Sequence, residues 1–126
     1  MATATISGTI SYPLVAGMPG TTIYLGNPTV TSSSSGGATV TFNEGGTQSL
    51  IVGSASPVTV PMGTVSSGSL MYFGTNQPVE LVLNSGSDTL TIAADGFILL
   101  AKCGVTSATL QAVSASATVT IAVLGD

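Results

Sequence analysis

The sequence predicts an all-β protein that forms a single sandwich domain over residues 1–126, in which residues 1–13 form an extended N-terminal strand or arm. Apolar and polar residues alternate with a period of two in most segments, which is the pattern of strands with one buried face. Turn residues separate these segments every 8–12 residues or so, which gives roughly ten strands and is typical of an all-β sandwich or barrel. No stretch shows the period of an amphipathic helix.

The most regular alternation lies in residues 78–102. Two turn signals, Ser85–Asp88 and Asp95-Gly96, divide this segment into three apolar-alternating runs. Asp95-Gly96 is the two-residue signal of a type I′ hairpin, because both turn positions need a positive φ and these residues tolerate it. The segment is therefore predicted to form a three-stranded antiparallel meander.

The register of this meander divides its side chains between two faces. Pairing about the two turns sets Ile92 opposite Leu99, and partners across a ladder project to the same side. The face predicted to be core carries Leu81, Leu83, Leu90, Ile92, Phe97 and Leu99. The other face is too apolar for a solvated surface and forms either a subunit contact or a second core layer; its residues are Val82, Ile98 and Leu100.

The remaining strands follow from the same alternation. The segment 57–61 has proline at both ends, which suits an edge strand because proline donates no ladder hydrogen bond. Ser32–Gly37 is the one low-complexity tract, and we expect a flexible turn there. Further alternating runs predict strands at residues 4–12, 21–25, 38–42, 48–52, 70–73, 108–112 and 119–123.

Charge and composition exclude several classes of protein. Charged residues make up 5% of the chain, the net charge is -4, and Lys102 is the only basic residue. Nucleic-acid binding and recruitment to an anionic membrane both need clusters of Lys and Arg, so we expect neither partner. Glycine, proline and hydroxyl residues interrupt every apolar run well before the roughly 20 residues of a membrane-spanning helix. The N-terminus has no signal-peptide pattern, and a single Cys103 suits a reducing compartment, so synthesis in a cytoplasm is expected.

The inventory of reactive groups predicts a protein that is not an enzyme and needs no cofactor. The chain has no histidine, which excludes Ser-His-Asp and Cys-His nucleophiles and histidine metal sites. Cys103 has only Lys102 beside it, and we expect it to behave as a small buried hydrophobe.

The few carboxylates are explained better by turn formation than by metal binding or catalysis. Asp88 and Asp95 lie at turn signals, where Asx side chains hydrogen-bond the local backbone. A calcium site would use Asp88 with Asn84, but the spacing matches no EF-hand loop, so no metal is predicted. Glycosidase chemistry would need two of the carboxylates to converge; the four candidates are Glu44, Glu80, Asp88 and Asp95.

The tyrosines allow one binding hypothesis. An aromatic face suits the apolar face of a pyranose ring, so Tyr12, Tyr24 and Tyr72 would serve as a sugar-stacking platform if exposed. Packing in a core or an interface with the hydroxyl at the rim is the interpretation that we favour.

Several segments between Gln48 and Asp126 resemble small structural proteins of tailed bacteriophage virions. The shared features are short strands closed by glycine or asparagine turns, a P-V-E-L strand and two late hairpins; in this chain they read TQSLIVG, VTVPMGTVSSGSLMYFGTNQPVELVL and TIAADGFILLAKCGVTSATLQAVSASATVTIAVLGD. The resemblance implies a jelly-roll-like β-sandwich that decorates or cements the outer capsid surface, commonly as a trimer bound to the major capsid protein. Related modules of phage tails and fibres imply an alternative, a carbohydrate- or receptor-binding β-module.

The residues themselves also favour a structural role. A β-protein with few charges and too many outward apolar residues needs a partner to cover them, and symmetric homo-oligomers are the simplest cover. The Thr-rich N-terminal strand is suited to extend the sheet of a neighbour. We therefore expect a capsid cement subunit, located on the virion after synthesis in the host cytoplasm, whose contact residues are Ile6, Ile10, Tyr12, Val82, Ile98 and Leu100.

Overall fold

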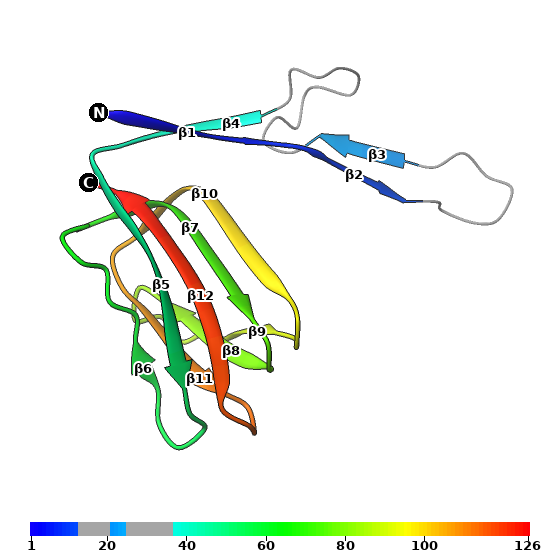
Figure 1. The fold of residues 1–126 in the computed structure, drawn as a ribbon, viewed down its shortest axis with the longest axis vertical. Coiled ribbons are helices and arrows are strands. Elements are labelled where there is room, and N and C mark those ends of the chain that lie inside the picture. The colour runs from blue at the N-terminus through cyan, green and yellow to red at the C-terminus, as the bar shows by residue number, and fades with distance from the viewer. Residues whose placement is uncertain (13–20, 25–36) are drawn as a thin grey trace, which may run out of the picture.

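The computed structural model describes residues 1–12, 21–24 and 37–126, and every regular element in these ranges is a β-strand. The predicted all-β class is confirmed (Figure 1). The strands are β1 (Ala2–Ser7), β2 (Thr9–Tyr12), β3 (Thr21–Tyr24), β4 (Gly37–Phe42), β5 (Glu44–Val52), β6 (Val58–Thr59), β7 (Gly68–Thr75), β8 (Val79–Leu83), β9 (Leu90–Ile92), β10 (Phe97–Val105), β11 (Ala108–Ala112) and β12 (Ala117–Gly125).

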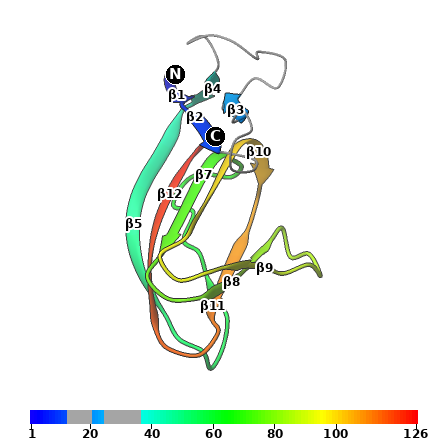
Figure 2. The ribbon, with the colours of Figure 1, turned by 90° about the vertical axis from the view of Figure 1, so that its right-hand side faces the viewer.

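Two four-stranded antiparallel sheets form the sandwich, with strand orders β10-β7-β12-β5 and β6-β11-β8-β9. Figure 2 shows them as two layers. The chain crosses from one sheet to the other at every connection except that between β8 and β9, which are neighbours in the same sheet. The core lies between the layers and is almost entirely aliphatic, with Phe73 and Met71 its largest fully buried side chains.

The strand pairing is nested. β5 pairs with β12, β6 with β11, β7 with β10 and β8 with β9, so the first strand of the sandwich pairs with the last and the innermost two pair with each other. The chain thus follows the path of one long hairpin that is folded over on itself. Pairing of β12 with β7 and of β11 with β8 then joins the strand pairs of this hairpin into two sheets. This is the connectivity of a jelly roll, an architecture of eight strands in two sheets.

In most strands, the apolar residues at alternate positions face the core as predicted. Val119, Ile121 and Val123 of β12 are buried, and so are Ala108, Leu110 and Ala112 of β11. Removing a fully buried aromatic or aliphatic side chain of this kind costs about 2–5 kcal/mol of stability, because a cavity remains where its atoms were. The inward-facing rows of these two strands therefore anchor one sheet to the other.

The predicted pairing at Asp95-Gly96 is wrong, whereas β8 and β9 do form a hairpin. Its register differs by two residues from the one expected from pairing about Ser85–Asp88, because Leu81 lies opposite Leu90 and not opposite Ile92. A shift of two leaves the same side chains on each face. β9 and β10 lie in different sheets, and the segment between them crosses from one to the other. The turn is closed by the backbone N–H of Gly96, which donates to the carbonyl of Ala93 at an N···O distance of 3.0 Å. Its two central residues are thus Ala94 and Asp95, and only Asp95 has a positive φ, 58°. A type I′ hairpin needs a positive φ at both central residues, so this turn does not return the chain alongside β9.

The facing of β10 is also opposite to the prediction. β10 pairs with β7, where Ile98 lies opposite Phe73 and Leu99 opposite Tyr72. Since Phe73 is fully buried, Ile98 faces inward with it and Leu99 faces outward. Ile98 and Leu100 pack against the core, while Phe97 and Leu99, predicted as core, are 64% and 38% exposed.

One residue of the neighbouring hairpin also departs from the predicted core. Leu90 is 45% exposed because β9 is the edge strand of its sheet, whereas Ile92 and Leu81 are buried and Leu83 packs against the core as predicted.

The structure also shows the outcome of the predictions for the proline-flanked segment and for the N-terminal strand. The proline-flanked segment forms β6, which is an edge strand as expected. The predicted first strand divides into β1 and β2 at Gly8. The flexible turn expected over Ser32–Gly37 lies outside the described residues except for Gly37, which begins β4.

An N-terminal ribbon, formed by β1 to β4, stands apart from the two sheets (Figures 1 and 2). β1 pairs with β4, and β2 pairs with β3 further from the sandwich. β4 contacts β7, β10 and β12, so the base of the ribbon rests on one end of their sheet. This contact explains why Leu70 is buried although its register on β7 points it away from the core.

The end of β12 is held in place by the β6–β7 loop. The backbone N–H groups of Ser66 and Ser67 donate to the carbonyl of Asp126 at N···O distances of 2.6 and 2.9 Å. The side-chain amide of Asn43 donates to Asp126 Oδ1 at 2.7 Å. Gly125 has no room for a side chain, because an added Cβ would collide with the carbonyl of Ser67.

The facing of β10 can be tested with two neighbouring charged substitutions. Ile98→Asp places a carboxylate against the core and is expected to lower the free energy of unfolding by about 3 kcal/mol or more, because an unpaired charge is desolvated. Leu99→Asp, the matched control, places the same group in solvent and should change stability by less than about 1 kcal/mol. Urea unfolding followed by circular dichroism measures both; equal losses would contradict the assigned register.

Candidate functional site

The two outer faces of the sandwich differ in polarity. The outer face of β6-β11-β8-β9 is mostly polar, with Glu80 between Gln111 and Thr91 in adjacent strands. The outer face of β10-β7-β12-β5 is apolar along β10 and β7 and carries, by register, Leu70, Tyr72, Phe97, Leu99, Ala122 and Leu124. Its end near the ribbon is covered, so the apolar surface that remains open lies at the far end, around Phe97.

A shallow open depression of about 570 Å³ lies at this far end, and we call it the Phe97 depression. Three chain segments meet there, namely the end of β7 with the residue after it, the turn before β10, and the start of β12. The residues lining it are Tyr72, Gly74, Thr75, Asn76, Asp95, Gly96, Phe97, Thr118 and Thr120.

Two aromatic rings form the apolar part of the Phe97 depression. The rings of Tyr72 and Phe97 are stacked, with centroids 5.8 Å apart and planes inclined by 26°. Gly74 lies opposite Phe97 in the ladder and leaves space for this arrangement, because an added Cβ would lie 2.6 Å from Tyr72 Oη. Phe97 nevertheless keeps 64% of its surface exposed, so its ring is available to a ligand.

Backbone hydrogen bonds fix the three segments to one another. The N–H of Thr75 donates to the carbonyl of Gly96 at 3.1 Å, and the N–H of Asn76 donates to the carbonyl of Thr118 at 3.3 Å. Asn76 Oδ1 accepts from the N–H of Thr118 at 2.8 Å, which orients the Asn76 amide and directs its oxygen to the backbone. The side chains of the Phe97 depression thus stand on a rigid base at the ends of paired strands.

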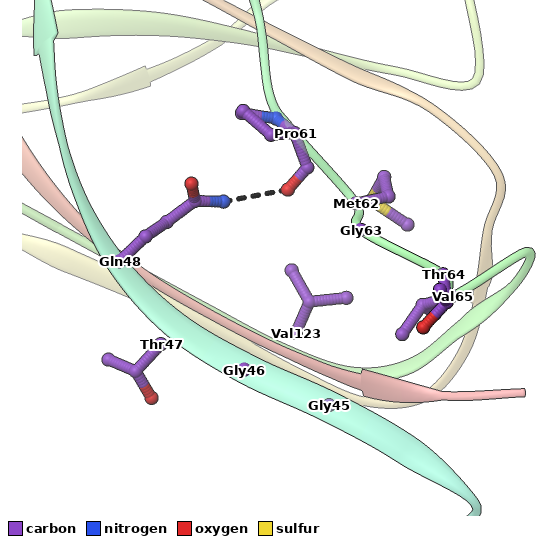
Figure 3. A pocket seen from close by; sticks show the side chains of 10 residues that line it. All are labelled: Gly45, Gly46, Thr47, Gln48, Pro61, Met62, Gly63, Thr64, Val65 and Val123. Carbon is purple, nitrogen blue, oxygen red and sulfur yellow. Dashed lines mark hydrogen bonds between the residues drawn. The ribbon is translucent and has the colours of Figure 1, made fainter.

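A second depression, of about 260 Å³, lies between β5 and the loop after β6. Gln48 reaches across it and donates through Nε2 to the carbonyl of Pro61 at 2.7 Å, and Val123 points into the same space (Figure 3). The lining is glycine, aliphatic or hydroxyl-bearing apart from Gln48, and it contains no titratable side chain. This depression therefore offers neutral polar side chains and backbone groups but no charged group.

Asn84 has a structural role that leaves it unsuited to the calcium site considered from sequence. Its Oδ1 accepts from the N–H and the hydroxyl of Thr106 at 2.7 and 3.2 Å, and its Nδ2 donates to the carbonyl of Gly104 at 3.1 Å. Asn84 therefore ties the β8–β9 loop to the β10–β11 turn, and its oxygen already has partners.

The four carboxylates considered for glycosidase chemistry are all exposed, and Asp95 alone lines either of the two depressions. Within residues 1–12, 21–24 and 37–126, no group of three or more His, Cys, Asp or Glu side chains lies close enough to hold a metal ion.

Cys103 lies beside the bulge in β10 and packs against the core. Its thiol donates to the carbonyl of Gly68 at an S···O distance of 3.3 Å. Burial raises the pKa of the Cys103 thiol, and this effect exceeds the lowering by nearby backbone N–H groups. The thiolate is therefore disfavoured, which agrees with the expected role of a small hydrophobe.

The structure places the sequence-predicted contact residues in different surroundings. Ile6 of β1 is half-buried in the ribbon, while the side chains of Ile10 and Tyr12 lie outside what is described. Val82 is half-buried on the polar outer face, opposite Thr109. Ile98 and Leu100 take the alternative role considered for them and pack against the core.

Of the three tyrosines proposed for sugar stacking, Tyr72 lies in the Phe97 depression, and the side chains of Tyr12 and Tyr24 are outside the described set. Sequence reasoning missed Phe97 because the predicted register turned it inward. It also missed Asn76, Thr118 and Thr120, because no local motif connects three segments so far apart in the chain. The available signal was that both alternating sets of β10 are apolar, so one of them had to face outward.

Comparison with protein families, with curated proteins and with solved structures finds no match to this chain. The described residues include no helix of the length and apolarity needed to cross a membrane. The function proposed below therefore rests on the residues of the chain and on their geometry.

The raised pKa of Cys103 leads to a testable expectation for its reactivity. Below that pKa the folded chain should react with a thiol reagent such as iodoacetamide several-fold more slowly than a free cysteine, because less thiolate is present. The rate should rise with pH through the alkaline range and reach that of a free thiol on unfolding in urea. Mass spectrometry of the alkylated chain measures the rates, with Cys103→Ser as the blank; fast labelling of the folded chain at neutral pH would contradict the burial of the thiol.

Proposed function

We propose that the chain is a non-catalytic structural subunit of a protein assembly, and that its N-terminal ribbon binds a neighbouring subunit. The observation that carries this proposal is the sheet formed by β2 and β3, which projects beyond the sandwich (Figure 1) and has no further strand in the part of the chain that the structure describes. The ribbon joins the sandwich at β4, so it is held at one end and free to reach another subunit at the other.

The energetics of small sheets support a partner for this ribbon. An isolated two-stranded hairpin is marginally stable in water, and three or more strands or a packed face are needed for independent stability. Within the described residues, β2 and β3 have no third strand, and their outer backbone edges can extend a sheet. A neighbouring subunit that adds a strand or covers one face would supply what is missing.

The surface composition also suits an assembled protein. With 5% charged residues, the chain has few like charges to keep copies apart. The apolar outer face of β10-β7-β12-β5 adds exposed Phe97 and Leu99. A surface of this kind favours close packing between subunits over life as a dispersed monomer.

In its more specific form, the proposal is a trimeric cement subunit on the capsid of a tailed bacteriophage, bound to the major capsid protein. Support comes from the resemblance of the C-terminal two-thirds of the sequence and from the jelly-roll connectivity, which is common among viral capsid domains. Jelly rolls also serve as lectins and cupins, so the fold agrees with this role and does not decide it.

Removal of the ribbon tests the assembly proposal. A variant lacking residues 2–36 retains β4 and the whole sandwich, and it should sediment as a folded monomer under conditions in which the full chain forms trimers. Ile6→Asp, a point change in β1, should weaken association in the same direction, since a charge would enter a half-buried contact. Sedimentation velocity at micromolar concentrations measures both; a full chain that remains monomeric, or a truncated chain that assembles equally well, would refute the ribbon contact.

The capsid form of the proposal has its own test. Phage capsids stripped of this subunit should regain thermal stability when the purified chain is added, because many subunits each bridge neighbouring capsid proteins and their modest contacts sum. The variant lacking residues 2–36 is the control and should restore less. Differential scanning calorimetry of the capsids gives the readout, and an unchanged melting temperature with the full chain would rule out a cement role.

A further inference from the structure

We propose that the Phe97 depression is a binding site for a neutral pyranose sugar, an activity that goes beyond the structural role above. The site lies at the end of the sheet opposite the ribbon, so the two surfaces do not overlap. The proposal depends on the aromatic pair, the polar groups around it and the absence of a cation, and each points to the same class of ligand.

The aromatic pair supplies the apolar side of the site. A pyranose ring has a face of C–H groups, and these carry the small positive charge that the negative face of an aromatic ring attracts. Phe97 is 64% exposed, and it lies opposite Gly74 in the ladder, where the absence of a side chain lets the Tyr72 ring lie beside it. The Tyr72 ring packs against the Phe97 ring and restricts its rotation, which lessens the side-chain freedom lost when a ligand binds.

The polar groups supply both acceptors and donors for hydroxyl groups. Asp95 offers a carboxylate that can accept from two adjacent sugar hydroxyls, and among the described residues its side chain has no hydrogen-bond partner. Asn76 uses its oxygen on the backbone of Thr118, which leaves its Nδ2 group as a donor toward the depression. Thr118 and Thr120 add hydroxyls from alternate positions of β12 on the same outer face.

The charge of the side chains around the depression favours a neutral sugar over an anionic one. Lys102 is the only basic side chain of the protein, and it does not line the depression, whereas Asp95 does. A phosphorylated, sulfated or acidic sugar would place its anion near a carboxylate with no cation to offset it. The depression, about 570 Å³, is within the range of 300–1,000 Å³ that small-molecule sites commonly occupy.

The test uses the full chain, labelled with ¹⁵N, and NMR titration with methyl glycosides of glucose, galactose, mannose and N-acetylglucosamine at millimolar concentrations. The backbone amides of Gly74, Asn76 and Gly96 should shift on binding, and one glycoside should bind more tightly than the others, because the donors and acceptors are fixed. Phe97→Ala and Asp95→Asn should each weaken binding by about tenfold, as expected for the loss of a stacking face or of a charged hydrogen-bond acceptor.

Two control variants keep the result interpretable. Leu90→Ala and Val113→Ala each remove an exposed apolar side chain that does not line the depression, and both variants should bind with unchanged affinity. The proposal is overturned if none of the four glycosides shifts the three amides, or if Phe97→Ala binds as well as the natural chain. It is also overturned if Phe97→Ala abolishes self-association, since the surface would then be a subunit contact; loss of trimers in the ribbon variants alone leaves the sugar site standing.

Discussion

Strand β12 pairs along its length with β5 on one side and with β7 on the other, and the rest of the sandwich depends on this position. The pairing brings residues 44–52 together with residues 117–125 and encloses the other strands between them. Closing so long a loop costs entropy, although the cost grows slowly with its length. This cost is offset by the burial of apolar side chains on the central strand, where Val119, Ile121 and Val123 face the opposite sheet. Inside the β5–β12 pair the inner strands follow the same nested order, with β6 on β11, β7 on β10 and β8 on β9.

Alternation predicted where the strands lie, but it did not predict their long-range pairing or the facing of β10. In β8, β11 and β12 only one alternating set is strongly apolar, so the hydrophobic pattern specifies which side faces the core. In β10 both sets are apolar, with Phe97 and Leu99 on one face and Ile98 and Leu100 on the other. The choice between them came from the partner strand β7, where Phe73 and Met71 are fully buried. A turn signal at Asp95-Gly96 did not help, since the same two residues also suit a turn that carries the chain into the other sheet.

The Phe97 depression shows why a site of this kind has no local sequence signature. Its side chains come from three strand ends that the nested pairing brings together, although Asn76 and Asp95 are 19 residues apart in the sequence and Phe97 and Thr118 are 21 apart. Tyr72 and Asp95 stood out as an aromatic residue and a turn residue, each with a plain structural explanation of its own. Only the register of β10 against β7 makes them neighbours, because it stacks Phe97 on Tyr72 and places the preceding turn beside them.

The central position of β12 has a consequence for how the protein is made. Synthesis proceeds from the N-terminal end at about 5–20 residues per second, so β5 and β7 emerge on the order of several seconds before the strand that lies between them. During that interval the inner edges of both strands present unpaired backbone groups and apolar side chains. The β10-β7-β12-β5 sheet cannot form until β12, which begins at residue 117, has been translated. Until then the exposed edges of β5 and β7 must be kept from pairing with other nascent copies. Spacing between ribosomes, or a chaperone that shields exposed strand edges, would thus govern the yield of the folded subunit as much as its final stability does.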